Sequence, residues 1–219
     1  MKLETTIIEE LKEEAEEKFK KIDIYKIFAY FLVCGFIGWI FETLAVWITL
    51  GELTDRGYLF VMGPLKDYIG FFANIPILDS IPLVWGLPII EMYGIGGVIM
   101  ILLFRHLKDH KAKIFVYGAI LMTLFELGSS YFCTMVLHHS YWDYKQEFLN
   151  FQGRICLRSS IAWGALSIVA IEFLMPRLDN LYRHIRARKN FKIVIAALII
   201  YTIICAATKY IIDPTIIAN

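Results

Sequence analysis

Five stretches of the chain are apolar along nearly their whole length, and each is about as long as a helix that crosses a bilayer. A spanning helix needs about 20 residues, and its backbone must satisfy its own polar groups because lipid offers no partners. The stretches therefore predict five transmembrane helices, over residues 24–50, 82–104, 114–137, 159–175 and 193–212. The predicted fold is all-α, a polytopic membrane bundle that occupies residues 23–213.

Three other segments complete the predicted organisation. Residues 1–22 carry a narrow apolar stripe and Glu–Lys pairs four residues apart, which predicts a cytoplasmic amphipathic helix, either solvated or docked on a partner. Residues 58–78 are apolar but broken by Gly63-Pro64 and Pro76, so we expect an interfacial or re-entrant segment. Pro88 indicates a late start for the second helix, and residues 214–219 form a short exoplasmic tail.

The composition and the distribution of charge place the protein in a membrane and give it an orientation. Apolar residues make up 58% of the chain and charged residues 20%, with a mean hydropathy of +0.59. Sixteen Lys and Arg lie within residues 1–26, 105–113 and 176–192, against five in the other two loops. The positive-inside rule then predicts a multi-pass plasma-membrane protein with a cytoplasmic N-terminus and an exoplasmic C-terminus. The net charge of only +1 argues against a nucleic-acid partner.

Carboxylates inside the predicted spans are the first candidates for function. An ionised acid at the bilayer centre costs about 2.5–3.5 kcal/mol on insertion scales. We therefore expect these acids to face one another, a cation or water, or to be protonated. They are Glu42, Glu91, Glu126 and Glu172.

Polar residues near the exoplasmic ends of the spans extend this set, and together they predict a polar cavity that opens to the exoplasm and binds a solute or lipid. The candidate lining residues are Glu42, Arg56, Glu91, Glu126, Ser130, His138, Asp143, Arg154 and Arg158. On the fourth span, the spacing places one inward-facing set of residues on a common face: Arg154, Arg158, Ala162, Ala165 and Glu172. The alternative is that Glu42 and Glu126 are structural residues that pair to fix helix register.

The other polar clusters predict neither a metal nor a cofactor. Two histidine clusters, within residues 106–110 and 138–143, offer only two or three ligands each, fewer than the four of a structural zinc site. The chain contains no G-x-x-x-x-G-K-S/T motif, so it has no phosphate-binding loop of that type. Cys133 and Cys156 both fall near the exoplasmic side, where oxidation to a disulfide is feasible.

Two blocks of sequence around the exoplasmic loops carry the most specific signal. The first reads TDRGYL at 54–59, GP at 63–64 and YGIGG at 93–97; the second reads YWDY at 141–144, NFQGRICL at 150–157 and SIAWG at 160–164. Together with Gly38-Trp39 and Glu42-Thr43, these blocks resemble the CmpB-type family of ABC-transporter permeases over roughly Gly38 to Gly164. The resemblance implies a transport subunit whose ATPase is a separate chain, docked on the basic cytoplasmic loops.

Three functions are compatible with the sequence. The leading hypothesis is the permease-like subunit, which is not itself an enzyme. The second is a membrane-embedded enzyme that acts on a lipid-linked substrate at the outer leaflet, with His138, Asp143, Glu42 and Arg154 as its candidate groups. The third is a non-catalytic membrane scaffold or sensor. No nucleophile–base spacing supports the enzyme. A homo-oligomer is compatible with each of the three.

Overall fold

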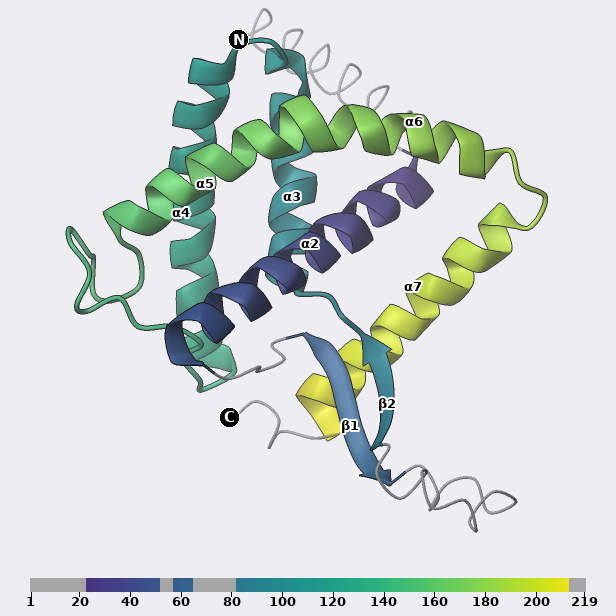
Figure 1. Cartoon of the computed structure of the whole chain (residues 1–219), viewed down its shortest axis with the longest axis horizontal. Coiled ribbons are helices and arrows are strands. Elements are labelled where there is room, and N and C mark those ends of the chain that lie inside the picture. Colours follow the sequence, from purple (N-terminus) through teal and green to yellow (C-terminus); the bar gives the residue numbers. More distant parts are fainter. Residues whose placement is uncertain (1–22, 52–56, 65–81, 213–219) are drawn as a thin grey trace, which may run out of the picture.

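The computed structural model of the chain describes residues 23–51, 57–64 and 82–212. The predicted amphipathic helix over 1–22, candidate residue Arg56, most of the predicted interfacial segment and the tail over 214–219 lie outside these ranges. The elements in chain order are α2 (Ile24–Leu50), β1 (Tyr58–Pro64), β2 (Pro82–Leu87), α3 (Glu91–Phe104), α4 (Lys111–Val136), α5 (Leu157–Ile168), α6 (Met175–Arg186) and α7 (Phe191–Ala207) (Figure 1). A short 3₁₀ turn, η4 (Arg105–Leu107), follows α3. Two π-helical segments, η5 (Val169–Leu174) and η6 (Thr208–Ile212), follow α5 and α7.

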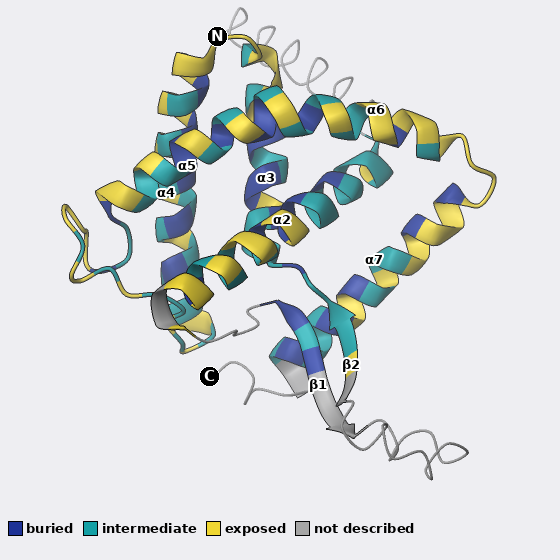
Figure 2. Ribbon diagram, viewed as in Figure 1, coloured by how far each residue is buried: buried dark blue, intermediate teal, exposed yellow. Residues whose placement is uncertain are grey.

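Long apolar helices dominate the described residues. Four helical stretches there are long and apolar enough to cross a bilayer: Ile24–Ile48, Lys111–Val136, Leu157–Arg186 and Phe191–Tyr210. Large apolar side chains are exposed along their outer faces, as the yellow segments in Figure 2 show. Because such faces are stable only in contact with lipid, the prediction of an all-α polytopic membrane bundle is confirmed.

The second predicted span differs from the prediction, because its first residues form a strand. β2 pairs antiparallel with β1, with Tyr58 opposite Leu87 and Phe60 opposite Trp85. Gly86 has φ +108°, and a Cβ there would lie 1.8 Å from the carbonyl oxygen of Tyr58, so only glycine fits. Pro88 keeps the preceding residue extended. The helix therefore begins at Glu91 rather than at residue 82, and its 14 residues are about 21 Å long, shorter than the apolar core of a bilayer.

The fourth predicted span is longer than predicted, because the helix does not end at Met175. Figure 1 shows α5 and α6 as one long rod, joined by η5, that continues to Arg186. Pro176 lies in the first turn of α6. Proline lacks a backbone donor and its ring clashes with the carbonyl of the preceding turn, and the wide π-helical turns of η5 accommodate this defect without a break.

The inward face of α5 is a correction to the sequence analysis. Trp163, Gly164 and Ser167 are buried, whereas Arg158 and Ala165 are exposed. Glycine explains the arrangement, because α4 and α5 approach closely where Gly118 meets Ser167; a Cβ at Gly118 would lie 2.1 Å from the Ser167 hydroxyl. This close contact orients Trp163 toward α4, one turn from Ser167 on the same face.

A polar contact holds α6 against the start of α2. The Tyr182 hydroxyl donates to Asp23 at 2.7 Å, and Lys26 pairs with Asp179 at 2.9 Å. Tyr182 also packs edge to face on Phe191, the first residue of α7. Three helices are therefore fixed together at this end of the bundle.

Candidate functional site

A buried carboxylate on α4 is the centre of the candidate site. Glu126 is only 3% exposed, and it continues a buried row of residues at every fourth position of α4 that includes Met122 and Ser130. Its two oxygens accept hydrogen bonds from different elements: Tyr144 donates to Oε1 at 3.0 Å, and the Trp163 indole donates to Oε2 at 3.1 Å. Both donors are neutral, so these bonds satisfy the oxygens without neutralising a charge.

A second carboxylate lies beside the first. The Tyr93 hydroxyl on α3 donates to Glu42 Oε1 on α2 at 2.8 Å. The Tyr93 ring packs on Trp163 with ring centroids 5.3 Å apart, so the partners of the two acids touch. A Cβ on Gly38 would lie 2.2 Å from Tyr93, so this ring fits against α2 only because the position is glycine. Glu42 is also near enough to Glu126 to interact with it electrostatically.

The loop from Leu137 to Cys156 between α4 and α5 covers this network from one end, and Arg154 fastens it to α4. The Arg154 guanidinium donates through Nη1 to the carbonyl of Ser130 at 3.0 Å, to its hydroxyl at 2.9 Å and to the Thr134 hydroxyl at 3.1 Å. It also lies 4.2 Å from the centre of the Tyr131 ring. The loop is therefore bound to the same helix face that carries Glu126, one turn away.

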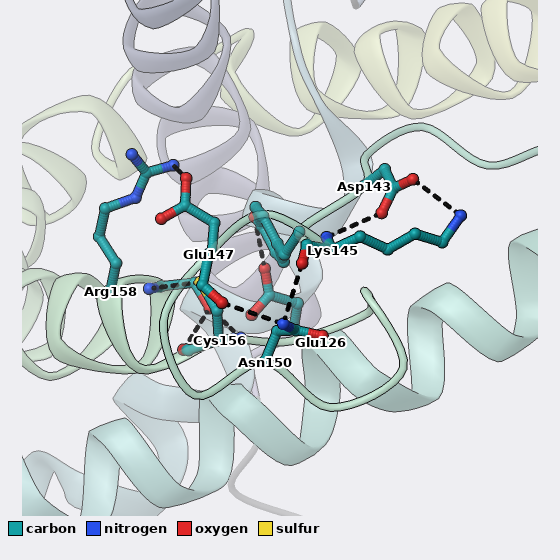
Figure 3. A network of polar contacts seen from close by, with 9 residues as sticks. Glu126, Asp143, Lys145, Glu147, Asn150, Cys156 and Arg158 are labelled. Atoms are coloured by element: carbon teal, nitrogen blue, oxygen red, sulfur yellow. Dashed lines mark hydrogen bonds and ion pairs between the residues drawn. The ribbon is translucent and has the colours of Figure 1, made fainter.

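Internal hydrogen bonds give this loop a fixed shape, part of which Figure 3 shows. Asn150 donates to the carbonyls of Lys145 and Glu147 and accepts from the Gly153 amide at 3.1 Å. Gly153 has φ +69°, and a Cβ there would lie 2.7 Å from Asp143 Oδ1. The Tyr144 amide donates to the Gly153 carbonyl at 2.8 Å, which holds Tyr144 in position to reach Glu126.

Asp143 belongs to the framework of the loop rather than to the buried network. The backbone amide of Lys145 donates to its Oδ1 at 2.9 Å, and the Lys145 ammonium lies 3.1 Å from its Oδ2. These hydrogen bonds lower the pKa of Asp143 below its ordinary value, so it is ionised at neutral pH. Cys156, also in the second sequence block, caps α5: its sulfur accepts from the Ser159 amide, and the thiol is free.

Glu91 lies in a different cluster, near the hairpin formed by β1 and β2. The Tyr210 hydroxyl donates to Glu91 Oε1. Beside it Lys209, only 5% exposed, donates to the Gly57 carbonyl at 3.3 Å and lies 5.1 Å from the centre of the Tyr58 ring. Because Gly57 and Tyr58 begin the hairpin, this cluster fastens the hairpin to the end of α7.

The predicted site residues are thus divided among several places. Glu42, Glu126, Ser130 and Arg154 lie together in the network and its loop. Glu91 and Asp143 have separate surroundings, His138 is exposed with φ +53°, and Arg158 lies on the surface, paired with Glu147 at 2.9 Å. Sequence reasoning missed Tyr93, Tyr144 and Trp163 as the partners of the acids, although all three fall in the two sequence blocks.

A small apolar cleft lies against the network. Its volume is about 110 Å³, and α2, α3 and the α5–α6 rod supply its walls. The lining includes the rings of Tyr93 and Trp163, while Ile37, Phe41 and Val169 on its rim are exposed where lipid would lie. The carboxylates of Glu42 and Glu126 therefore lie behind these rings as seen from the cleft.

Replacement of Arg154 tests whether this residue organises the loop. Hydrogen bonds to a charged group contribute about 1.5–3 kcal/mol each, so Arg154→Ala should raise the hydrogen-exchange rates of residues 137–156 at least tenfold while α4 stays protected. Lys145→Ala is the matched control, because its exposed ion pair with Asp143 contributes little. Equal exchange rates in the two variants would contradict the assignment.

Comparison with known proteins identifies the family. No curated protein and no solved structure matches the chain. A protein-family model described as "Putative ABC-transporter type IV" matches residues 29–209, from within α2 to just past the end of α7. The chain therefore belongs to this CmpB-type family and is a multi-pass membrane protein of transporter type.

Proposed function

We propose that this chain is the membrane-spanning, permease-like subunit of an ABC transporter, and that Glu126 and Glu42 bind the cationic group of a solute or lipid during its passage. The observation that carries the proposal is the burial of Glu126 among neutral hydrogen-bond donors within a bilayer-spanning helix. Intramembrane acids are costly, and in membrane proteins they commonly mark the pathways of substrates, ions or protons.

The chemistry of the site favours a cation. Tyr144 and Trp163 orient the Glu126 carboxylate by hydrogen bonding but supply no positive charge, and Tyr93 orients Glu42 beside it. Two acids close together repel one another when both are ionised, and either a bound cation or a shared proton relieves that repulsion. The site therefore suits an ammonium group that enters as a proton leaves, or the reverse.

Access to the pair involves the α4–α5 loop. Among the partners of Glu126 that lie in the described residues, Tyr144 is carried by a loop rather than by a helix, so displacement of this loop would uncover the carboxylate. In the proposed orientation the loop is exoplasmic, the N-terminus is cytoplasmic and the C-terminus is exoplasmic. The predicted polar cavity would form by this movement, with Ser130 and Arg154 at its mouth.

The proposed cytoplasmic side carries an exposed basic surface for an ATPase subunit. It is formed by residues Arg177, Arg183, Arg188 and Lys189, at the end of the α5–α6 rod and in the turn before α7. Because the rod is continuous from this surface to Trp163, a movement imposed at its basic end would be transmitted to the Glu126 network.

Purification of the chain from its native membrane tests this function. We expect an ATPase to co-purify, with ATP turnover lost when this chain is removed. Arg183→Gln combined with Arg188→Gln should reduce the recovered ATPase about tenfold, because both side chains are exposed and their charges would contact the partner. Enough basic residues remain nearby to preserve orientation.

Lys145→Gln, in the loop at the other end of the bundle, serves as the control and should leave recovery unchanged. Absence of any ATPase in repeated mild-detergent purifications would contradict the transport function. Conversion of a lipid-linked substrate by the purified chain without nucleotide would favour the enzyme hypothesis instead.

A further inference from the structure

A surface groove lies where the α4–α5 loop meets the start of α5. Its volume is about 270 Å³, and its lining residues are Glu147, Phe148, Leu157, Arg158 and Ile161. The groove combines two kinds of surface: a pair of opposite charges at one side, and three large apolar side chains at the other. None of its five lining residues binds the Glu126 carboxylate through a described hydrogen bond, although the Glu147 backbone amide donates to the Tyr144 carbonyl at 2.9 Å, so the groove borders the loop that carries Tyr144.

The apolar wall of the groove is continuous with the lipid-facing surface of the bundle. Residues at every fourth position along α5 and η5 are exposed, and they form one stripe: Leu157, Ile161, Ala165, Val169 and Phe173. The first two of these also line the groove. Across from them Phe148, 74% exposed, projects from the loop. An acyl chain that lies along the stripe therefore ends in this groove.

The charged side of the groove lies where a lipid headgroup would be. Leu157 is the first residue of a bilayer-spanning helix, so Arg158 and Glu147 are at the depth of the headgroups. Arg158 pairs with Glu147 through Nη2 only, at 2.9 Å, and its side chain is 72% exposed (Figure 3). A guanidinium has five N–H donors, and the ion pair with Glu147 occupies one side of it, so N–H donors of Arg158 remain to bind a phosphate oxygen.

We propose that this groove binds one membrane phospholipid with an amine headgroup. The phosphodiester is bound by Arg158, the ammonium lies against Glu147, and an acyl chain runs between Phe148 and Ile161 onto the stripe. In the orientation proposed above, the lipid belongs to the exoplasmic leaflet. The site does not depend on what the protein transports, because its residues differ from those of the carboxylate network.

Native mass spectrometry of the full-length chain, released from detergent with added phosphatidylethanolamine or phosphatidylglycerol, tests the proposal. The unaltered chain should retain more phosphatidylethanolamine than phosphatidylglycerol. Arg158→Gln should retain about tenfold less phosphatidylethanolamine, the loss expected when one charge-assisted hydrogen bond to the phosphate is removed. Arg183→Gln, at an exposed arginine near the far end of the same rod, is the matched control and should retain as much lipid as the unaltered chain.

Two further variants separate the parts of the site. Glu147→Gln should bind both phospholipids equally, and Phe148→Ser, an exposed change that leaves the charges intact, should also reduce retention. Unfolding midpoints equal to that of the unaltered chain show that each variant is folded. Equal retention by the Arg158 and Arg183 variants would overturn the proposal, as would displacement of the lipid by millimolar inorganic phosphate, which would indicate a free-anion site.

Discussion

Gly118→Ala is expected to destabilise the bundle by about 2–3 kcal/mol, because it places a methyl group where α5 already lies. The new Cβ would lie 2.1 Å from the Ser167 hydroxyl and 2.4 Å from its Cβ, and the Ser167 Cβ cannot move without displacing the helix. Ser167 is fully buried, and its hydroxyl donates to the Trp163 carbonyl at 2.7 Å. Denaturant unfolding of the purified protein in detergent, followed by far-UV circular dichroism, measures the loss.

Gly128→Ala is a close control on the same helix. A Cβ at Gly128 meets nothing within 4 Å, so this variant should be neutral or up to about 1 kcal/mol more stable, as expected when alanine replaces an exposed helical glycine. Similar unfolding curves for the two variants would show that α4 and α5 do not pack as closely as the contact between Gly118 and Ser167 requires.

Most helices of this fold could be predicted from the sequence, whereas the strand pairing could not. Long apolar stretches predicted the helices α2, α4, α5 and α7, because a bilayer leaves few alternatives for such segments. At residues 82–90 Pro88 indicated the late start of the helix, but not the strand before it: Gly86 and Pro88 favour extended backbone, and the strand also needs a partner, β1, from a distant part of the chain. Pairing between distant segments cannot be read from hydropathy.

The candidate site was predictable to a similar extent. Acidic residues inside membrane spans are rare, so each one can be recognised in the sequence by itself, and Glu42 and Glu126 were identified in this way. Their partners were not, because Tyr93 and Trp163 are ordinary aromatic residues until packing brings them within reach of a carboxylate. The inward face of α5 was assigned from small residues, but a buried Trp163 and a lipid-facing Ala165 reverse that assignment, since the close approach to α4 occurs at Gly118.

Arg154 and Arg158 show the limit of spacing arguments most clearly. Four residues apart, they were expected to line the same cavity, yet Arg158 is on α5 whereas Arg154 precedes the helix and turns back to α4. Cys156, the residue between them that caps α5, marks the change of direction. Periodicity applies only within one helix, and this helix begins between the two arginines.

Two substitutions of Glu126, to Leu and to Gln, distinguish a structural role of this residue from a role in transport. Glu126→Leu removes the acceptor of two donors, and Trp163 in particular is buried and would be left unpaired. An unpaired buried donor costs about 1–3 kcal/mol, so this variant should lose stability and ATP turnover together. Unfolding in detergent and ATP turnover of the complex purified from the native membrane are the two measurements.

Glu126→Gln has the opposite expected pattern. The amide has nearly the same shape and keeps one acceptor oxygen, so the unfolding midpoint should stay close to that of the unaltered chain, while ATP turnover of the complex should be lost because the charge that binds the cation is gone. Glu172→Gln is the control, since Glu172 accepts from the Asp109 amide at 2.8 Å, away from the network, and should keep full turnover. A stable Glu126→Gln variant with normal turnover would assign Glu126 to fixing the packing of α4 against α5, and the cation site would have to be sought elsewhere.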